Sequence, residues 1–302
     1  MLIPLRPLSI RRRAAGAVAV LLLPALLAAR AISAKPPVRG TVVVGLADAS
    51  GAKEATLWGL GAFDPVRGWI KDAEARRLFA RGTRFTLYSL SRKPASGRLT
   101  GLPQDSEAGG GYSAPLATAG KAPEHALALS GPIGASVQPR AIHVGGAATP
   151  ADEKALVALL KTEGRITVAR PHMTQILHVD LNGDGSDEVL LTAEERLVNN
   201  DGEPEDPAAR ARLGKSPVYT AVALRCRGEN GAIETVPLAM NTFRKDSTDS
   251  NEHYEVLTCA DINGDGKMEV VLYSQYSEGE GISVFRFDGR QVKRVLNASW
   301  GA

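Results

Sequence analysis

Two nine-residue stretches of this chain are almost the same sequence, and each lies between two short apolar runs. The first is Asp180–Glu188, DLNGDGSDE, and the second is Asp261–Glu269, DINGDGKME. The residues on either side are rich in Val, Ile and Leu, which is typical of β-strands bounded by turn residues. We therefore expect the unit strand, acidic loop, strand to form twice, with the same loop geometry in both copies.

Both loops place side-chain oxygens at positions 1, 3, 5 and 9 and a glycine at position 6. Ca²⁺ in proteins takes six to eight oxygen ligands at about 2.3–2.6 Å, and glycine allows the sharp turn that gathers them. Asn-Gly and Asp-Gly are also common hairpin turns, so a single copy is consistent with an ordinary turn. The acid at position 9 and the repetition favour a cation site, and the predicted cofactor is Ca²⁺.

The residue at position 12 excludes two better-known calcium loops. An EF-hand needs a bidentate Glu there and helices on both sides. Position 12 is Leu191 in the first copy and Leu272 in the second, and the flanks are predicted strands. A dockerin-type loop also needs an acid at this position and is excluded in the same way.

The pattern resembles the calcium loops of FG-GAP and VCBS repeats, which occur in integrin α-subunit propellers and in many bacterial exported proteins. The resemblance spans roughly residues 176–295. It implies ligation by side chains at positions 1, 3, 5 and 9 and by the backbone carbonyl at position 7. The metal residues that it implies are Asp180, Asn182, Asp184, Ser186, Glu188, Asp261, Asn263, Asp265, Lys267 and Glu269.

The fold class expected for the chain is mainly β. Residues 165–302 form the predicted repeat domain, and each repeat has the strand pattern of one four-stranded antiparallel propeller blade. A closed propeller needs at least about four blades, but the sequence shows only two loops. We therefore expect two blade-like units. The strands expected in them cover residues 176–179, 188–192, 219–226, 233–238, 254–259, 269–274, 282–287 and 291–296, and residues 194–216 are expected to be a solvated loop.

Residues 38–148 are predicted to form a separate small β domain, either a barrel or a sandwich. One helix is expected at Asp72–Ala80, and the polar, glycine-rich residues 91–111 are expected to be a loop. Residues 149–164 are predicted to be a helix that connects the two domains. Thr149 is a good N-cap, and Gly164 is a typical helix stop.

The first 31 residues have the pattern of a secretory signal peptide. Arginines precede an apolar run at residues 14–29, and Ala29-Arg30-Ala31 is a suitable cleavage site. An uncleaved anchor helix is the alternative. We expect a secreted, periplasmic or cell-surface protein with no transmembrane span after cleavage. Loss of five arginines changes the formal net charge from +3 to −2, so no nucleic-acid partner is expected.

The chain has two cysteines, Cys226 and Cys259, and both lie in predicted strands of the repeat domain. An even number of cysteines in an exported chain predicts a disulfide. Two buried free thiols are the alternative.

The sequence contains no nucleophile, zinc-protease or phosphate-loop motif. The expected function is therefore that of a non-catalytic calcium-binding β-repeat protein of the bacterial envelope. Its role would be structural or adhesive, with a protein or a glycan as partner. The alternative is an exported hydrolase with its catalytic residues in the N-terminal domain or at the junction with the repeats. A deep polar pocket with His or Ser next to an acid would favour the hydrolase.

Overall fold

The computed structural model describes residues 40–50, 54–90, 93–106, 111–131, 137–197, 203–204, 206–212, 217–228, 230–243, 252–289 and 291–301. The chain divides into a unit of residues 1–33 and a unit of residues 34–302, and all described residues belong to the second. The predicted signal peptide therefore lies outside them. Of the described residues, 53% lie in strands and 11% in helices, which confirms the mainly β class.

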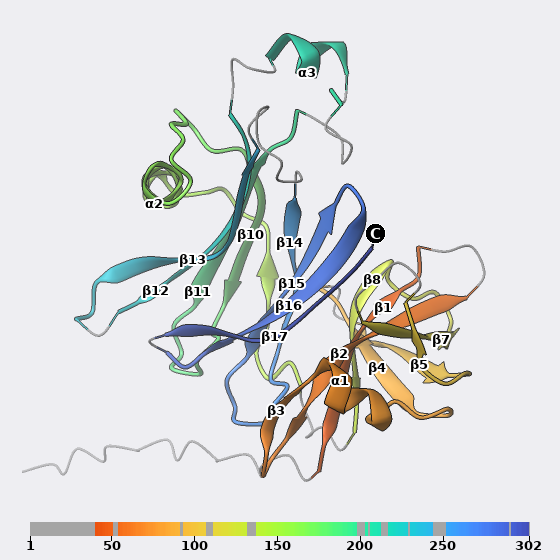
Figure 1. The fold of residues 1–302 in the computed structure, drawn as a ribbon. Coiled ribbons are helices and arrows are strands. Elements are labelled where there is room, and N and C mark those ends of the chain that lie inside the picture. Colours follow the sequence, from red (N-terminus) through yellow and green to blue (C-terminus); the bar gives the residue numbers. More distant parts are fainter. Residues whose placement is uncertain are drawn as a thin grey trace, which may run out of the picture. The chain divides into compact units, whose positions relative to one another are not determined.

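Six strands close into a small barrel (Figure 1), which decides between the two predicted forms of the N-terminal domain. The order around the barrel is β2-β1-β8-β4-β5-β7, and β7 pairs back onto β2. Two short strands, β3 (Gly68–Lys71) and β6 (Gln104–Asp105), extend it. The barrel strands are β1 (Val42–Asp48), β2 (Ala55–Asp64), β4 (Arg84–Tyr88), β5 (Ala95–Leu99), β7 (Tyr112–Ala119) and β8 (His125–Ser130).

The apolar run of β1 is continuous because both of its faces are buried. Val43 and Ala47 belong to the core inside the barrel, together with Phe85 and Leu116. Val42, Val44 and Leu46 belong to a second core outside the barrel, which the last four strands of the chain also line. The barrel therefore shares a core with the C-terminal part of the structure.

Strand β5 corrects the prediction that residues 91–111 are a loop. Ser96 and Arg98 are exposed, whereas Gly97 and Leu99 are buried. A Cβ at Gly97 would lie 2.9 Å from Leu116 Cδ1, so the small residue lets β5 pack closely on the barrel core. The expected helix at Asp72–Ala80 is shorter, consisting of α1 (Asp72–Ala75) followed by a 3₁₀ turn.

The repeat region forms two antiparallel sheets, each with four long strands, as predicted. In both sheets the strands follow one another in chain order, and the short β9 (His143–Val144) pairs with β10. The first sheet contains β10 (Met173–Val179), β11 (Glu188–Glu195), β12 (Val218–Arg227) and β13 (Ile233–Phe243). The second contains β14 (His253–Ala260), β15 (Glu269–Tyr276), β16 (Gly279–Phe287) and β17 (Val292–Gly301).

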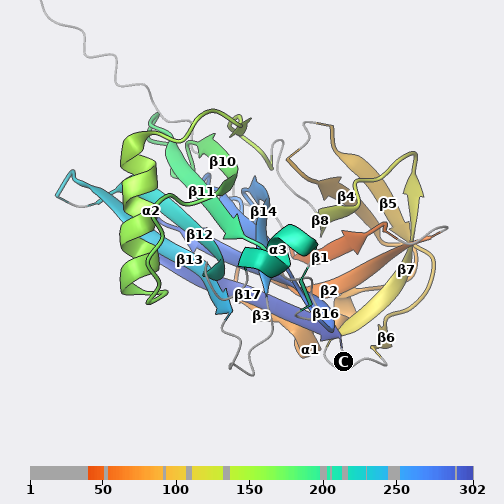
Figure 2. The ribbon, with the colours of Figure 1, turned by 90° about the horizontal axis from the view of Figure 1, so that it is seen from above.

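The connecting helix α2 (Pro150–Thr162) begins at the predicted cap. Thr149 and Asp152 form a reciprocal capping box, in which each side chain accepts from the other residue's backbone N–H. Leu156 and Leu160 are buried in one core cluster with residues from one face of the first sheet, and Figure 2 shows α2 beside β10–β13. No helix among the described residues is long and apolar enough to span a membrane.

The opposite face of the first sheet packs on the second sheet. Leu190, Leu224, Leu272 and Phe287 belong to this shared core. The order of layers is thus helix, first sheet, second sheet and barrel. In the segment 194–216, expected to be a loop, β11 continues to Glu195 and α3 (Pro207–Arg212) follows, which corrects that prediction.

Candidate metal loops and the groove between the sheets

Each acidic loop connects two neighbouring strands at the same point of its sheet. Val179 pairs with Glu188 where the first loop closes, and Ala260 pairs with Glu269 where the second closes. The position-9 acids are therefore the first residues of β11 and β15. Both are buried, with only 4% of Glu188 and 1% of Glu269 exposed. The predicted strand, loop, strand unit occurs twice.

In the first loop, the acids accept hydrogen bonds from the loop's own backbone. Asp180 Oδ2 accepts from the N–H of Gly185 at 3.1 Å. Asp184 Oδ1 accepts from the N–H of Ser186 at 2.7 Å, and Glu188 Oε2 accepts from the N–H of Leu181 at 2.8 Å. These bonds wrap the backbone around the carboxylates.

The second loop repeats these bonds at the matching positions. Asp261 Oδ2 accepts from the N–H of Gly266 at 3.0 Å. Asp265 Oδ1 accepts from the N–H of Lys267 at 2.9 Å, and Glu269 Oε2 accepts from the N–H of Ile262 at 2.9 Å. The duplication thus extends from the amino-acid sequence to individual hydrogen bonds.

The side-chain amide of the asparagine at position 3 lies between two carboxylates in each loop. Asn182 Nδ2 donates to Asp184 Oδ2 and to Glu188 Oε1, both at 3.1 Å. Asn263 Nδ2 donates to Asp265 Oδ2 at 3.2 Å and to Glu269 Oε1 at 2.8 Å. The side chains at positions 3, 5 and 9 are therefore neighbours in both loops.

The glycine at position 6 is required by the backbone. Gly185 has φ of 90° and Gly266 has φ of 87°, values that L-residues other than Asn and Asp rarely adopt. This conformation turns their N–H groups toward the carboxylate at position 1. A side chain at position 6 would oppose the turn that holds the acids together.

Burial and the neighbouring carboxylates raise the pKa of the acid at position 9 in both loops. Burial, followed by the charges of Asp184 and Asp180, raises the pKa of Glu188 to about 7 although Leu181 donates to it. Burial likewise raises the pKa of Glu269 well above its usual value. Buried carboxylates close to other carboxylates are stabilised by a bound cation, which supplies the missing positive charge.

The donor chemistry of both loops fits Ca²⁺. Each provides three carboxylates and an amide oxygen, and the backbone carbonyl of Ser186 or Lys267 completes the predicted set. No group of three or more His, Cys, Asp or Glu side chains within the described ranges is already gathered closely enough to hold an ion. Like charges repel over a few ångströms, so the carboxylates would have to move closer together for a cation to bind.

The sequence did not single out Arg140, which contacts both loops. Its guanidinium donates to the carbonyls of Asp180 and of Leu181, the latter at 3.0 Å, and to that of Gly266 at 2.8 Å. The Met268 N–H also donates to the Leu181 carbonyl at 2.8 Å. Arg140 lies 40 residues before the first loop, so no local pattern could have assigned it to the site.

The two cysteines lie in the core between the two sheets. The structure has Cys226 and Cys259 as buried free thiols in one cluster. Burial raises the pKa of Cys226 to about 11 and that of Cys259 further, which makes both thiols weakly reactive. The predicted disulfide is not formed in the structure and stays a prediction for the oxidised protein.

A Ser, an Asp and a His meet at the end of the barrel, where the hydrolase alternative would place catalytic residues. Ser50 Oγ donates to Asp48 Oδ1 at 2.6 Å, and His125 Nε2 lies 3.8 Å from the same oxygen. In a catalytic triad the imidazole lies between the hydroxyl and the carboxylate. Here the carboxylate lies between the other two, so His125 does not activate Ser50 in this arrangement.

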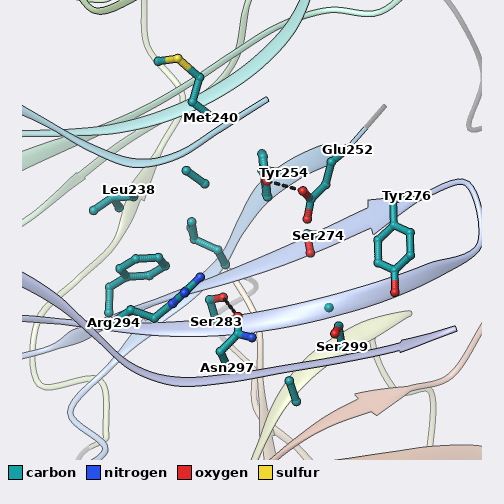
Figure 3. Close-up of a pocket in the computed structure, with 15 residues that line it drawn as sticks. Leu238, Met240, Glu252, Tyr254, Ser274, Tyr276, Ser283, Arg294, Asn297 and Ser299 are labelled. Carbon is teal, nitrogen blue, oxygen red and sulfur yellow. Dashed lines mark hydrogen bonds between the residues drawn. The ribbon is translucent and has the colours of Figure 1, made fainter. Parts of the chain in front are cut away.

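A polar groove of about 490 Å³ lies between β13 and the face of the second sheet (Figure 3). Leu238 and Met240 of β13 line one side, and hydroxyl and amide side chains of the second sheet line the other. Its size falls within the usual range of ligand pockets. It crosses several strands, and sequence reasoning missed it because its residues are dispersed between Leu238 and Ser299.

Comparisons of the chain with protein-family models, with curated proteins and with solved structures found no match in any of the three. The resemblance to FG-GAP and VCBS repeats therefore rests on the two loops and their flanking strands.

Proposed function

We propose that the chain is an exported, non-catalytic protein in which two Ca²⁺ loops stabilise a pair of blade-like sheets that bind a ligand. The observation that supports this proposal best is the duplication of the loop hydrogen bonds. Position-matched carboxylates accept from position-matched backbone N–H groups in both copies. A plain hairpin turn needs neither a buried acid at position 9 nor an amide between two carboxylates.

The two loops contact each other, and this contact joins the two sheets at one end. The Leu181 carbonyl accepts from the Met268 N–H, and Arg140 donates to both loops. A cation that draws in the carboxylates of one loop would therefore also restrain the neighbouring loop. Its role in this proposal is structural, namely to hold the ends of β10, β11, β14 and β15 in place.

Calcium-dependent melting of the mature protein tests the proposal. Ca²⁺ at about 1–10 mM, at or above the dissociation constants of about 0.1–1 mM of weak extracellular modules, should raise the melting temperature, and chelator should lower it. Asp184→Ala and Asp265→Ala should each remove part of this shift, and the double variant nearly all of it. Mg²⁺ should substitute poorly, because it requires a tighter octahedron and releases water reluctantly.

Asp187→Ala is the matched control, since it removes a carboxylate from the same loop at position 8, where no ligand is expected. Asp187 is exposed, and this variant should keep the full response to Ca²⁺. The proposal fails if the wild-type protein shows neither a melting shift nor binding heat up to about 10 mM Ca²⁺. It also fails if Asp187→Ala and Asp184→Ala lose the response equally.

A further inference from the structure

One stretch of the barrel carries basic side chains without acidic ones. Residues 75–104 contain seven Lys or Arg and no Asp or Glu, and they include strands β4 and β5. Since the chain without its predicted signal peptide has a formal net charge of −2, the residues outside this stretch sum to −9. Positive charge is therefore concentrated on one part of the barrel.

Two of these arginines face each other across neighbouring strands. Arg84 of β4 is paired with Arg98 of β5, and both residues are exposed. Like charges directly opposite each other destabilise a sheet. A Cβ at Gly82 would lie 3.3 Å from Arg98 Nη2, so the guanidinium of Arg98 lies against the turn that carries the exposed Arg81. We call Arg81, Arg84 and Arg98 the arginine patch.

The arginine patch lacks the acidic partners that nearby arginines have. Arg76 forms an ion pair with Asp105, and Arg77 forms one with Glu74. Within the part of the chain that the structure describes, the three arginines of the patch form no ion pair. Their mutual repulsion is therefore not compensated by these residues, and a bound anion would compensate it.

The surface around the arginine patch is open and carries small side chains. The outward residues in the adjoining rows of β4, β5 and β7 are Thr86, Ser96, Ala117 and Ala119. None is aromatic, so these rows offer no platform on which nucleic-acid bases could stack. Strands β5 and β7 contribute nothing to the core shared with the sheets and lie on the side of the barrel away from them (Figures 1 and 2). The patch is therefore accessible to a large partner.

An exposed leucine lies at the margin of the arginine patch. Leu102 is 64% exposed and follows Arg98 by four residues. The N–H of Gly82 donates to the carbonyl of Leu99 at 2.8 Å, so the turn that carries Arg81 lies beside the residues that lead to Leu102. A bilayer surface offers phosphates directly above hydrocarbon, which matches guanidinium groups next to an apolar side chain. A soluble polyanion has no apolar layer for a leucine.

We propose that the arginine patch binds the anionic headgroups of a membrane surface, with the guanidinium groups on lipid phosphates and Leu102 in the boundary layer beneath them. Arginine fits phosphate because its planar fork offers two parallel hydrogen bonds. So few contacts give reversible binding, which would hold the mature protein at the membrane surface. This inference goes beyond the proposed calcium function and uses no residue of the acidic loops or of the two sheets.

Co-sedimentation of the mature protein with lipid vesicles tests the inference. Calcium-free buffer of low ionic strength prevents Ca²⁺ from bridging the acidic loops to the lipid. The wild-type protein should bind vesicles of phosphatidylglycerol and phosphatidylcholine in equal parts, should not bind phosphatidylcholine alone, and should be released by salt. The double variant Arg84→Gln/Arg98→Gln should bind more weakly by about fivefold for each arginine removed. Its melting temperature should not fall, because the change removes a repulsive pair.

Lys161→Gln/Arg227→Gln is the matched control. It removes the same charge from exposed positions of α2 and β12, so it should change vesicle binding by less than about twofold. Leu102→Ser separates a membrane from a soluble polyanion. It should weaken binding to the mixed vesicles severalfold and leave binding to dextran sulfate unchanged.

The inference is overturned if the wild-type protein does not bind the mixed vesicles, or if the patch variant and the control variant bind them equally. It is also overturned if Leu102→Ser binds the mixed vesicles like wild type, since the patch would then recognise anions without a membrane. Because calcium melting is measured separately, failure of the loops and failure of the arginine patch give different results.

Discussion

The Arg140 guanidinium donates a 2.8 Å hydrogen bond to the carbonyl of Gly266, while it also donates to two carbonyls of the first loop. One side chain therefore fixes the backbone of both acidic loops. Arginine suits this position because its planar fork carries several donors in fixed directions and is always charged. The two loops are consequently coupled even when no cation is bound.

Replacing Arg140 should loosen both loops together. Arg140→Met keeps the length of the side chain but removes every donor, so three carbonyls lose a charged partner. We expect the free energy of unfolding of the metal-free protein to fall by about 2–4 kcal/mol. Hydrogen exchange should speed up at the amides of Gly185 and Gly266 in the same variant.

Arg286→Gln provides the control for this prediction. Arg286 is paired with Asp265 at 3.4 Å, in the second loop alone, and the two side chains are 45% and 33% exposed. Its loss should change stability by less than about 1 kcal/mol and affect exchange in the second loop only. Independent loops would be indicated if Arg140→Met accelerated exchange in one loop and left the other at its wild-type rate.

Asp152 predicts a pH dependence of stability. Burial acts to raise its pKa, but hydrogen bonds from Thr149 and the charge of Arg225 outweigh this and lower the pKa below 3.8. A group with a lowered pKa in the folded state stabilises the fold above its unfolded pKa, and this contribution is lost as the pH falls through the folded pKa. Asp152 should therefore stabilise the fold at neutral pH and progressively less below about pH 4.

Urea unfolding of Asp152→Asn measures this contribution. The variant leaves Arg225 without its buried carboxylate partner, so we expect a loss of about 2–4 kcal/mol at pH 7. The difference from wild type should shrink between about pH 4 and pH 3. Glu153→Gln is the control: its partner Arg170 is 80% exposed, so its loss should be below about 1 kcal/mol. A difference that does not depend on pH would refute this account of Asp152.

The parts of the fold that sequence reasoning found are those with strong local signals. The cap at Thr149 and the leucine row predicted α2, and the acidic repeats predicted two sheets with loops at equivalent places. Strand β5 was missed because its inward positions are Ala95, Gly97 and Leu99, and two of these are too small to give a clear apolar alternation. In that strand, close packing on Leu116 replaces hydrophobic bulk.

Sequence reasoning had the same limit at the candidate site, where it found local patterns and missed contacts between distant segments. The loop residues are adjacent in sequence, so their type and spacing carried the prediction. Arg140 reaches the loops across 40 and 126 residues of chain, and the groove joins Met240 to Asn297 across strands of two sheets. Contacts of this kind depend on strand order and register, which periodicity within one segment does not specify.

Trp58 of the barrel stacks on Trp300 of the second sheet, with ring centroids 4.8 Å apart and ring planes at 7°. Trp300 is 6% exposed and lies in the core that β1 and β8 of the barrel share with β15–β17. Because this core joins the barrel to the second sheet, we expect the two to unfold together. Tryptophan fluorescence and far-UV circular dichroism should report a single coincident transition.

Trp300→Ala should lower the free energy of unfolding by about 3–5 kcal/mol, since it leaves a large cavity in that core. Trp300→Phe is the matched control: it keeps an aromatic face against Trp58 and should lose clearly less. Two separate transitions in the wild-type protein would show that the barrel folds without the second sheet. A loss below about 1 kcal/mol in Trp300→Ala, within the range of an ordinary surface change, would show that the stack does not hold the two parts together.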